Sequence, residues 1–323
     1  MDTTTTMTRN QTKGYVIALV GTFIWSTTAI LIRHLTNQWH LPPIILAFWR
    51  DFFVFLILVL ILGFFRRSLL FTTRSTFLYL LIYGLVLAVF NFTWTLSVYY
   101  NGAAVSTVLA YSSAAFTAVL GWRFLNENLG GAKILAVGFS LTGCILVSGA
   151  ASVSAWALNP LGIVTGLISG MAFAIYSLFG RQASRRGIPS LTTLTYTFGT
   201  AAGFLLLFNM VEIPGYSGIR HLFWLENSLV GWGFLILLAF GPTIGGYGLY
   251  TVSLGYLPAS VANLIATLEP ALTAVQAYLF LGERLTSTQL AGSILILGGV
   301  IFLRWSEQRV TARQILPSGT TPQ

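Results

Sequence analysis

Residues 261–285 read VANLIATLEPALTAVQAYLFLGERL, an apolar stretch that carries Glu269 and Pro270 near its middle. Its length and hydropathy are typical of a membrane-crossing helix, which needs about 20 apolar residues. A charged side chain near the bilayer centre costs about 2.5–3.5 kcal/mol on insertion scales. Pro270 also lacks an N–H, which leaves the carbonyl of Ala266 without its helical partner. Because free polar groups in lipid must be satisfied inside the protein or by water, the stretch predicts a polar site facing the interior of a helix bundle.

The whole chain has the composition of a polytopic membrane protein. Its 323 residues are 55% hydrophobic and 8% charged, whereas soluble domains carry about 25% charged residues. The net charge is +9, and the basic residues lie in short clusters between apolar runs. This arrangement favours a role of these residues as orientation signals over a role in nucleic-acid binding. Cys144 lies in an apolar run and is the single cysteine, so it cannot form an intrachain disulfide and is expected to pack in the core.

Apolar runs of membrane-spanning length predict an all-α membrane protein with ten transmembrane helices. We place these at 15–32, 43–65, 76–99, 103–123, 132–150, 160–181, 191–210, 229–252, 257–281 and 288–304.

The distribution of Lys and Arg predicts the orientation. With the N-terminus cytoplasmic, thirteen of these residues fall inside and three, Arg33, Arg220 and Arg284, fall outside. The positive-inside rule therefore predicts that both termini are cytoplasmic, in a multi-pass protein of the plasma membrane.

An internal repeat relates the two halves of the chain. At an offset of 156 residues, Thr95 matches Thr251, Tyr100 matches Tyr256 and Glu127 matches Glu283. Five helices per half is an odd number, so the second repeat must enter the membrane inverted relative to the first. We interpret Glu127 and Glu283 as parts of the shared scaffold. The predicted regions are a disordered cytoplasmic N-terminus (1–14), a first repeat (15–150), a second repeat (160–304) and a cytoplasmic C-terminal tail (305–323).

The two repeats differ at the most polar part of residues 261–285. Ser113-Ala114 stands in the first half where the second half has Glu269-Pro270. Pro270 predicts one helix break. A second is predicted in the eighth helix at Pro242, Gly245 and Gly246, since Gly/Pro interruptions at membrane depth mark binding sites.

Glu269 has three possible roles: a proton-coupling carboxylate, a partner for a substrate amine, or a structural hydrogen-bond anchor. An Arg50–Glu269 pair is possible across the bundle, although Arg50 could also have a purely structural role. Arg50 and Asp51 point about 100° apart on a helix and are expected not to pair face to face.

Further residues are expected to line the substrate pathway, with core packing or a lipid-facing aromatic belt as the alternative. They are the mid-helix amides Asn91 and Asn263 and the aromatic residues Trp25, Trp94, Tyr111, Tyr176, Tyr247 and Tyr250.

The pattern LEPALTAVQAYLFLGERLTSTQLAGSILILGGVIFL at 268–303 resembles the second repeat of EamA-type members of the drug/metabolite transporter superfamily. The first repeat agrees at 112–147, as do Trp25-Ser26 and Arg50. The resemblance implies a ten-helix carrier without a bound cofactor or metal, with helices five and ten packed outside a central cavity. It implies alternating access with efflux of small metabolites, either amino acids or related compounds, or alternatively cationic drugs.

Other classes of protein find little support in the sequence. His34, His40 and His221 are scattered near predicted outer loops and form no HExxH motif. An intramembrane enzyme or a receptor stays as an alternative of a different class. Small-molecule substrate and lipid are the expected partners.

Overall fold

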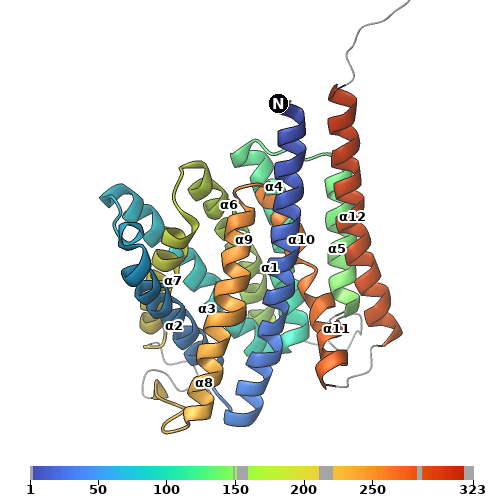
Figure 1. Cartoon of the computed structure of the whole chain (residues 1–323). Helices are drawn as coiled ribbons and strands as arrows, with labels where there is room; N and C mark the ends of the chain where they lie inside the picture. The colour runs from blue at the N-terminus through green and yellow to red at the C-terminus, as the bar shows by residue number, and fades with distance from the viewer. Residues whose placement is uncertain (1–2, 148–149, 151–158, 211–220, 282–285, 316–323) are drawn as a thin grey trace, which may run out of the picture.

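The chain folds into a bundle of helices in a computed structural model that describes residues 3–147, 150, 159–210, 221–281 and 286–315 (Figure 1). No strand occurs among these residues. The first half contains α1 (Thr3–Trp39), α2 (Pro43–Phe65), η1 (Arg67–Leu70), α3 (Arg74–Tyr111), α4 (Ser113–Leu125) and α5 (Gly131–Val147). The second half contains α6 (Pro160–Arg185), α7 (Ser190–Phe208), α8 (Leu229–Leu238), η4 (Ala239–Tyr247), α9 (Gly248–Ser253), α10 (Ala259–Ala266), α11 (Glu269–Leu281) and α12 (Ser287–Ile315).

Eight helical stretches among the described residues are long and apolar enough to cross a membrane, and Gly131–Val147 is a shorter apolar helix. This confirms an all-helical, multi-pass membrane protein. The predicted ninth helix, 257–281, is instead divided into α10 and α11 by a turn at Thr267 and Leu268. Pro270 accounts for the division, because it cannot donate a helical hydrogen bond to the carbonyl of Ala266, where α10 ends.

The first helix starts earlier than the sequence suggested. Residues 1–14 are predicted to be disordered, but α1 begins at Thr3 and runs to Trp39. Neither proline nor glycine occurs between Thr3 and Lys13, so nothing in this segment interrupts the hydrogen bonds of the helix. At the other end, α12 continues to Ile315.

Helix α3 contains a sharp bend. The hydroxyl of Ser97 donates to that of Ser106 at 2.8 Å although the two are nine residues apart. In a straight helix their backbones would be about 13 Å apart. The chain therefore folds back between them, and the arms 74–101 and 105–111 belong to two different membrane spans.

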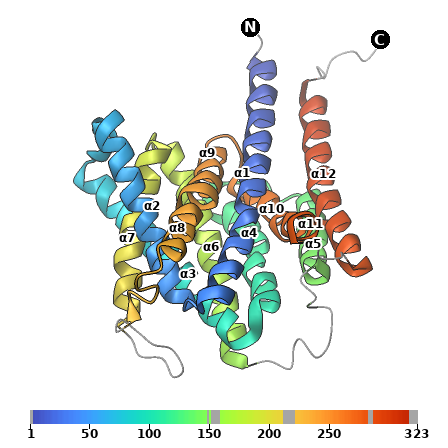
Figure 2. The same ribbon diagram turned by 60° about the horizontal axis from the view of Figure 1, so that its bottom comes forward.

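Helices α5 and α12 pack against each other at one side of the bundle (Figures 1 and 2). The other helices form the main body, in which α3 packs against α6 and α7, and α1 against η4, α9 and α11. Hydrogen bonds fix α1 to α11: Gln276 Nε2 donates to Ser26 Oγ at 2.8 Å, and Thr273 Oγ1 donates to the Ser26 carbonyl at 3.0 Å.

The predicted interruption of the eighth helix takes the form of a π-helical segment, η4, with Pro242 inside it. Pro242 cannot donate to the carbonyl of Leu238, and the hydroxyl of Thr243 donates to that carbonyl instead, at 2.7 Å. Gly246 allows α1 to approach closely, because a Cβ there would lie 2.8 Å from Cβ of Trp25. The segment thus brings the eighth helix against the part of α1 that carries Trp25.

Candidate functional site

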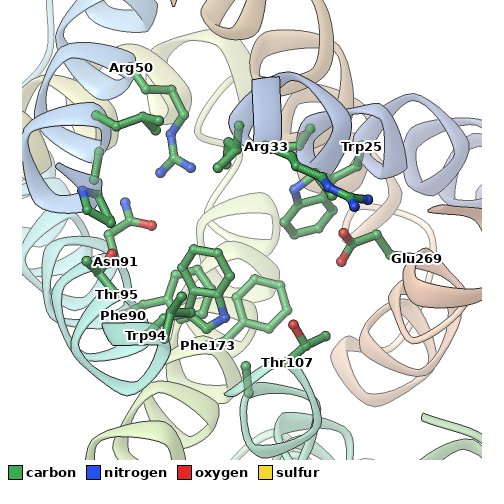
Figure 3. A pocket seen from close by; sticks show the side chains of 18 of the residues that line it. Trp25, Arg33, Arg50, Phe90, Asn91, Trp94, Thr95, Thr107, Phe173 and Glu269 are labelled. Atoms are coloured by element: carbon green, nitrogen blue, oxygen red, sulfur yellow. The ribbon is translucent and has the colours of Figure 1, made fainter. Parts of the chain in front are cut away.

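A cavity of about 460 Å³ lies in the main body, surrounded by residues of α1, α2, α3, α6, η4 and α11. It extends from Thr36 and Pro43, at the connection between α1 and α2, inward to Tyr111 and Glu269. Seven of the predicted pathway residues line it: Trp25, Arg50, Asn91, Trp94, Tyr111, Tyr247 and Glu269. Figure 3 shows Arg50 and Asn91 on one wall and Glu269 on the opposite one.

Arg50 and Asp51 form a buried ion pair, so the expectation that they do not pair is wrong. Nε of Arg50 donates to Oδ1 of Asp51 at 3.0 Å, and Nη2 lies 3.0 Å from the same oxygen. The long arginine side chain curls back along the helix surface, which a 100° offset at Cα does not prevent. The other carboxylate oxygen, Oδ2, accepts a hydrogen bond from Nδ2 of Asn91 at 2.8 Å.

Glu269 is held by a residue from the other half of the chain. The hydroxyl of Tyr111, at the end of α3, donates to Oε2 of Glu269 at the start of α11, 158 residues away. The anticipated Arg50–Glu269 contact is absent from the ion pairs of the described residues, because the guanidinium of Arg50 contacts Asp51. Figure 3 shows both carboxylate oxygens of Glu269 directed toward the cavity.

Packed aromatic rings form part of the cavity wall. The ring of Trp25 packs at 4.4 Å from Tyr247, 5.7 Å from Phe173 and 5.8 Å from Tyr250, measured between centroids. The rings of Tyr83 and Tyr176 are 4.7 Å apart and fully buried. Tyr176 and Tyr250 both pack against the ring of Phe173 and are not among the residues that line the cavity.

Asn263 also lies behind the cavity, in a hydrogen-bonded network. Its Oδ1 accepts from the Ser113 hydroxyl at 3.0 Å and its Nδ2 donates to Oγ of Ser177 at 3.1 Å. The hydroxyls of Ser177 and Tyr250 are in turn 2.7 Å apart. This buried network joins α4, α6, α9 and α10.

The helix breaks of the two halves occur at matching positions. The chain turns at Ser112 between α3 and α4, and at Thr267 and Leu268 between α10 and α11. The offset of 156 residues places Ser112 opposite Leu268. Only the second break is followed by a proline, Pro270, so the first break shows that the geometry does not depend on proline alone.

Glu127 follows α4 and is not among the residues that line the cavity. Its carboxylate accepts the N–H of Ala259 at 2.6 Å and that of Ser260 at 3.2 Å, and also contacts the Ser260 hydroxyl. Lys133 Nζ donates to Oγ of Ser260 at 2.9 Å. Glu127 therefore caps α10 across the two halves. Its counterpart Glu283 lies outside the described residues.

Sequence reasoning missed several cavity residues. Arg33, Thr28, Thr36, Thr95 and Thr107 line the cavity, as do Phe90 and Phe173. Arg33 was assigned to an outer loop but lies within α1, which continues to Trp39. Polar residues within the apolar runs could have indicated the threonines, whereas Phe90 and Phe173 resemble any lipid-facing phenylalanine.

A helical membrane bundle that surrounds a cavity lined by charged and aromatic side chains has the architecture of a small-molecule carrier. The model of the EamA-like transporter family matches residues 12–149 and again residues 160–305. The chain belongs to this family.

Relatives agree with this assignment, and a solved structure agrees with the fold. An "Uncharacterized transporter" of Archaeoglobus fulgidus is 26% identical over 68% of this chain and 75% of its own length. A protein of Salmonella typhimurium named "Probable amino-acid metabolite efflux pump" is 24% identical over 88% of this chain and 92% of its own length. A solved structure titled "Crystal structure of protein" has a TM-score of 0.74 at 17% identity, covering 93% of this chain and 99% of that one. At this identity it supports the fold.

Proposed function

We propose that the protein is a secondary transporter that exports small metabolites, amino acids or related compounds, across the plasma membrane by alternating access. The observation that carries the proposal is the cavity of about 460 Å³, which is lined by Glu269, Arg33 and Arg50. Groups of both charges, separated by aromatic walls, match a substrate that carries both an ammonium and a carboxylate. The name of the Salmonella relative supports the same class of substrate.

The proposed mechanism uses ten membrane crossings arranged as two inverted repeats of five helices. The matching breaks at Ser112 and at Thr267–Leu268 support such a duplication. In an inverted repeat, the two halves can exchange conformations, so that an outward-facing cavity becomes an inward-facing one. With cytoplasmic termini, the mouth at Thr36 and Pro43 faces outward.

Export of cationic compounds is a second candidate function. It is favoured by Glu269 standing beside the rings of Trp25 and Tyr111, since a carboxylate and aromatic faces both attract organic cations. Such a substrate would use Glu269 without needing Arg50.

Counterflow in proteoliposomes tests the proposal. The purified protein is reconstituted with an unlabelled compound inside, and uptake of the labelled compound is measured for amino acids, nucleosides and cationic dyes. We expect saturable exchange of amino acids. Exchange confined to cationic dyes would favour the second candidate, and folded protein that exchanges none of the panel would contradict both. Mass spectrometry of the recovered compounds checks that they leave chemically unchanged, which an intramembrane enzyme would not allow.

A further inference from the structure

Arg50 is the buried cation of the cavity wall. Its side chain is 8% exposed, and Figure 3 shows the guanidinium directed into the cavity. An unpaired arginine at this depth would be expensive in a membrane. Asp51, which is fully buried and lies behind the lining, neutralises it. The charge of Arg50 is therefore compensated within the bundle without any contact to Glu269.

The contact to Asp51 leaves part of the guanidinium available. A guanidinium has five N–H donors, and Asp51 Oδ1 accepts the one on Nε. Nη2 is buried against the same oxygen of Asp51, at 3.0 Å. Nη1 makes no hydrogen bond within the part of the chain that the structure describes, and Arg50 lines the cavity. The terminal nitrogens of an arginine suit a carboxylate in particular, since two parallel N–H groups match its two oxygens.

Asp51 and Asn91 fix the direction in which Arg50 points. One oxygen of Asp51 contacts Arg50 and the other accepts the amide of Asn91 at 2.8 Å. Asn91 comes from α3 and Arg50 from α2, so this chain of hydrogen bonds ties the guanidinium to a neighbouring helix. A long side chain that would otherwise sample many rotamers is thereby held toward the cavity.

The opposite wall carries the complementary charge. Glu269 is held by Tyr111 and faces the cavity from α11, while Phe173 and Trp94 lie between the two walls (Figure 3). A substrate with one anionic and one cationic group can therefore contact both walls at once, whereas a simple amine can contact one.

We propose that Arg50 binds the carboxylate of the substrate, with Asp51 and Asn91 as positioning residues that orient its guanidinium. The proposal rests on the proposed function and deepens it, because it makes Arg50 the residue that separates amino acids from amines lacking a carboxylate.

The test uses pairs of compounds that differ by a carboxylate: L-leucine with isoamylamine, and L-tryptophan with tryptamine. In proteoliposome counterflow, the KM of each labelled amino acid and the inhibition constant of each amine are measured. For the wild-type protein we expect the amine to bind roughly 10- to 100-fold more weakly than its amino acid, the range expected for losing hydrogen bonds to a charged group.

Substitutions then separate recognition from folding. Arg50→Gln is expected to raise the KM of the amino acid roughly 10- to 100-fold and to leave the inhibition by the amine unchanged. Asn91→Ala should raise the same KM by a smaller factor, roughly 2- to 10-fold, because it loosens Asp51. Arg50→Lys keeps the charge but not the paired N–H groups, and should fall between wild type and Arg50→Gln.

Arg181→Gln is the matched control. Arg181 is also partly buried, but its Nη1 donates to the carbonyl of Leu254 at 2.6 Å, away from the cavity residues. It should leave the ratio of amino acid to amine unchanged. If Arg50→Gln fails to fold because Asp51 is left unpaired, the double variant Arg50→Gln with Asp51→Asn removes both charges together and is expected to show the same loss of preference.

Two results would overturn the proposal while leaving a transporter in place: amines that bind the wild type as well as the amino acids do, or a preference for amino acids that survives in the folded Arg50 variants. Exchange of no compound at all would instead overturn the proposed function together with this inference.

Discussion

At the scale of single residues, Glu269 is the carboxylate among the described residues that line the cavity. Its hydrogen bond from Tyr111 joins the two halves of the chain at the innermost part of the cavity. The three roles considered for it, proton coupling, binding of a substrate amine and structural anchoring, make different predictions for transport.

We expect Glu269→Gln to remove the dependence of the transport rate on pH, because the amide still accepts a hydrogen bond from Tyr111 but does not titrate. The rate of proteoliposome counterflow is measured over a pH series, with folding checked by size-exclusion chromatography. Affinity for substrates with an ammonium should fall roughly 10-fold or more, since a charged hydrogen bond is lost.

Tyr111→Phe is the comparison for this prediction. It removes the hydrogen bond and keeps the carboxylate, so it should lower the rate while the pH dependence persists. A Glu269→Gln variant with the pH profile and affinity of the wild type would leave structural anchoring as the role of Glu269.

At the scale of elements, the eight-residue helix α10 depends on a cap from outside its own half. Glu127 follows α4 and accepts two N–H groups from the start of α10, at Ala259 and Ser260. A carboxylate at this place both satisfies unpaired donors and compensates the positive end of the helix dipole. The connection ties the first half of the chain to the second.

Glu127→Ala is therefore expected to destabilise the protein by about 1–2 kcal/mol, the upper part of the range for lost caps. The measurement is thermal unfolding in detergent. Gly121→Ala should act in the same direction, because a Cβ there would lie 2.8 Å from Oε2 of Glu127. Glu226→Gln, at an exposed carboxylate, is the control and should stay within about 0.5 kcal/mol of wild type. Equal melting temperatures for Glu127→Ala and Glu226→Gln would contradict the role of the cap.

At the scale of the whole molecule, the charge distribution predicts which end of the bundle faces outward. Asn37 lies at the cavity end of α1 and Ser75 lies at the start of α3, and both are exposed. Cys144, the single cysteine of the chain, is buried, so the wild type provides a background with little labelling.

In intact cells, a membrane-impermeant maleimide is expected to label Asn37→Cys and to leave Ser75→Cys unmodified until the cells are opened. The physical reason is the positive-inside bias, which keeps basic segments on the cytoplasmic side. Labelling is quantified on a gel after purification. The reverse pattern would invert the orientation, and with it the conclusion that the cavity mouth faces outward.

The sequence by itself determined the class of protein and the two helix interruptions that contain a proline, whereas the turn at Ser112, inside the predicted fourth helix, was not anticipated. Hydropathy and charge scarcity act along each segment, and a proline removes its hydrogen bond whatever surrounds it, so the bundle, the division at Pro270 and the irregular segment around Pro242 could all be predicted locally. Seven cavity residues were also anticipated, because polar and amphipathic side chains in apolar runs need partners inside the protein.

The tertiary structure decided which of these residues meet. Asp51 contacts Arg50 and Asn91, Tyr111 contacts Glu269, and Glu127 caps α10. Asn263, Tyr176 and Tyr250 lie behind the cavity although their sequence surroundings resemble those of the lining residues. These outcomes depend on side-chain rotamers and on contacts between segments up to 158 residues apart. Spacing along one helix does not determine rotamers, as the pairing of Arg50 with its neighbour Asp51 shows, and it does not identify partners that come from another helix.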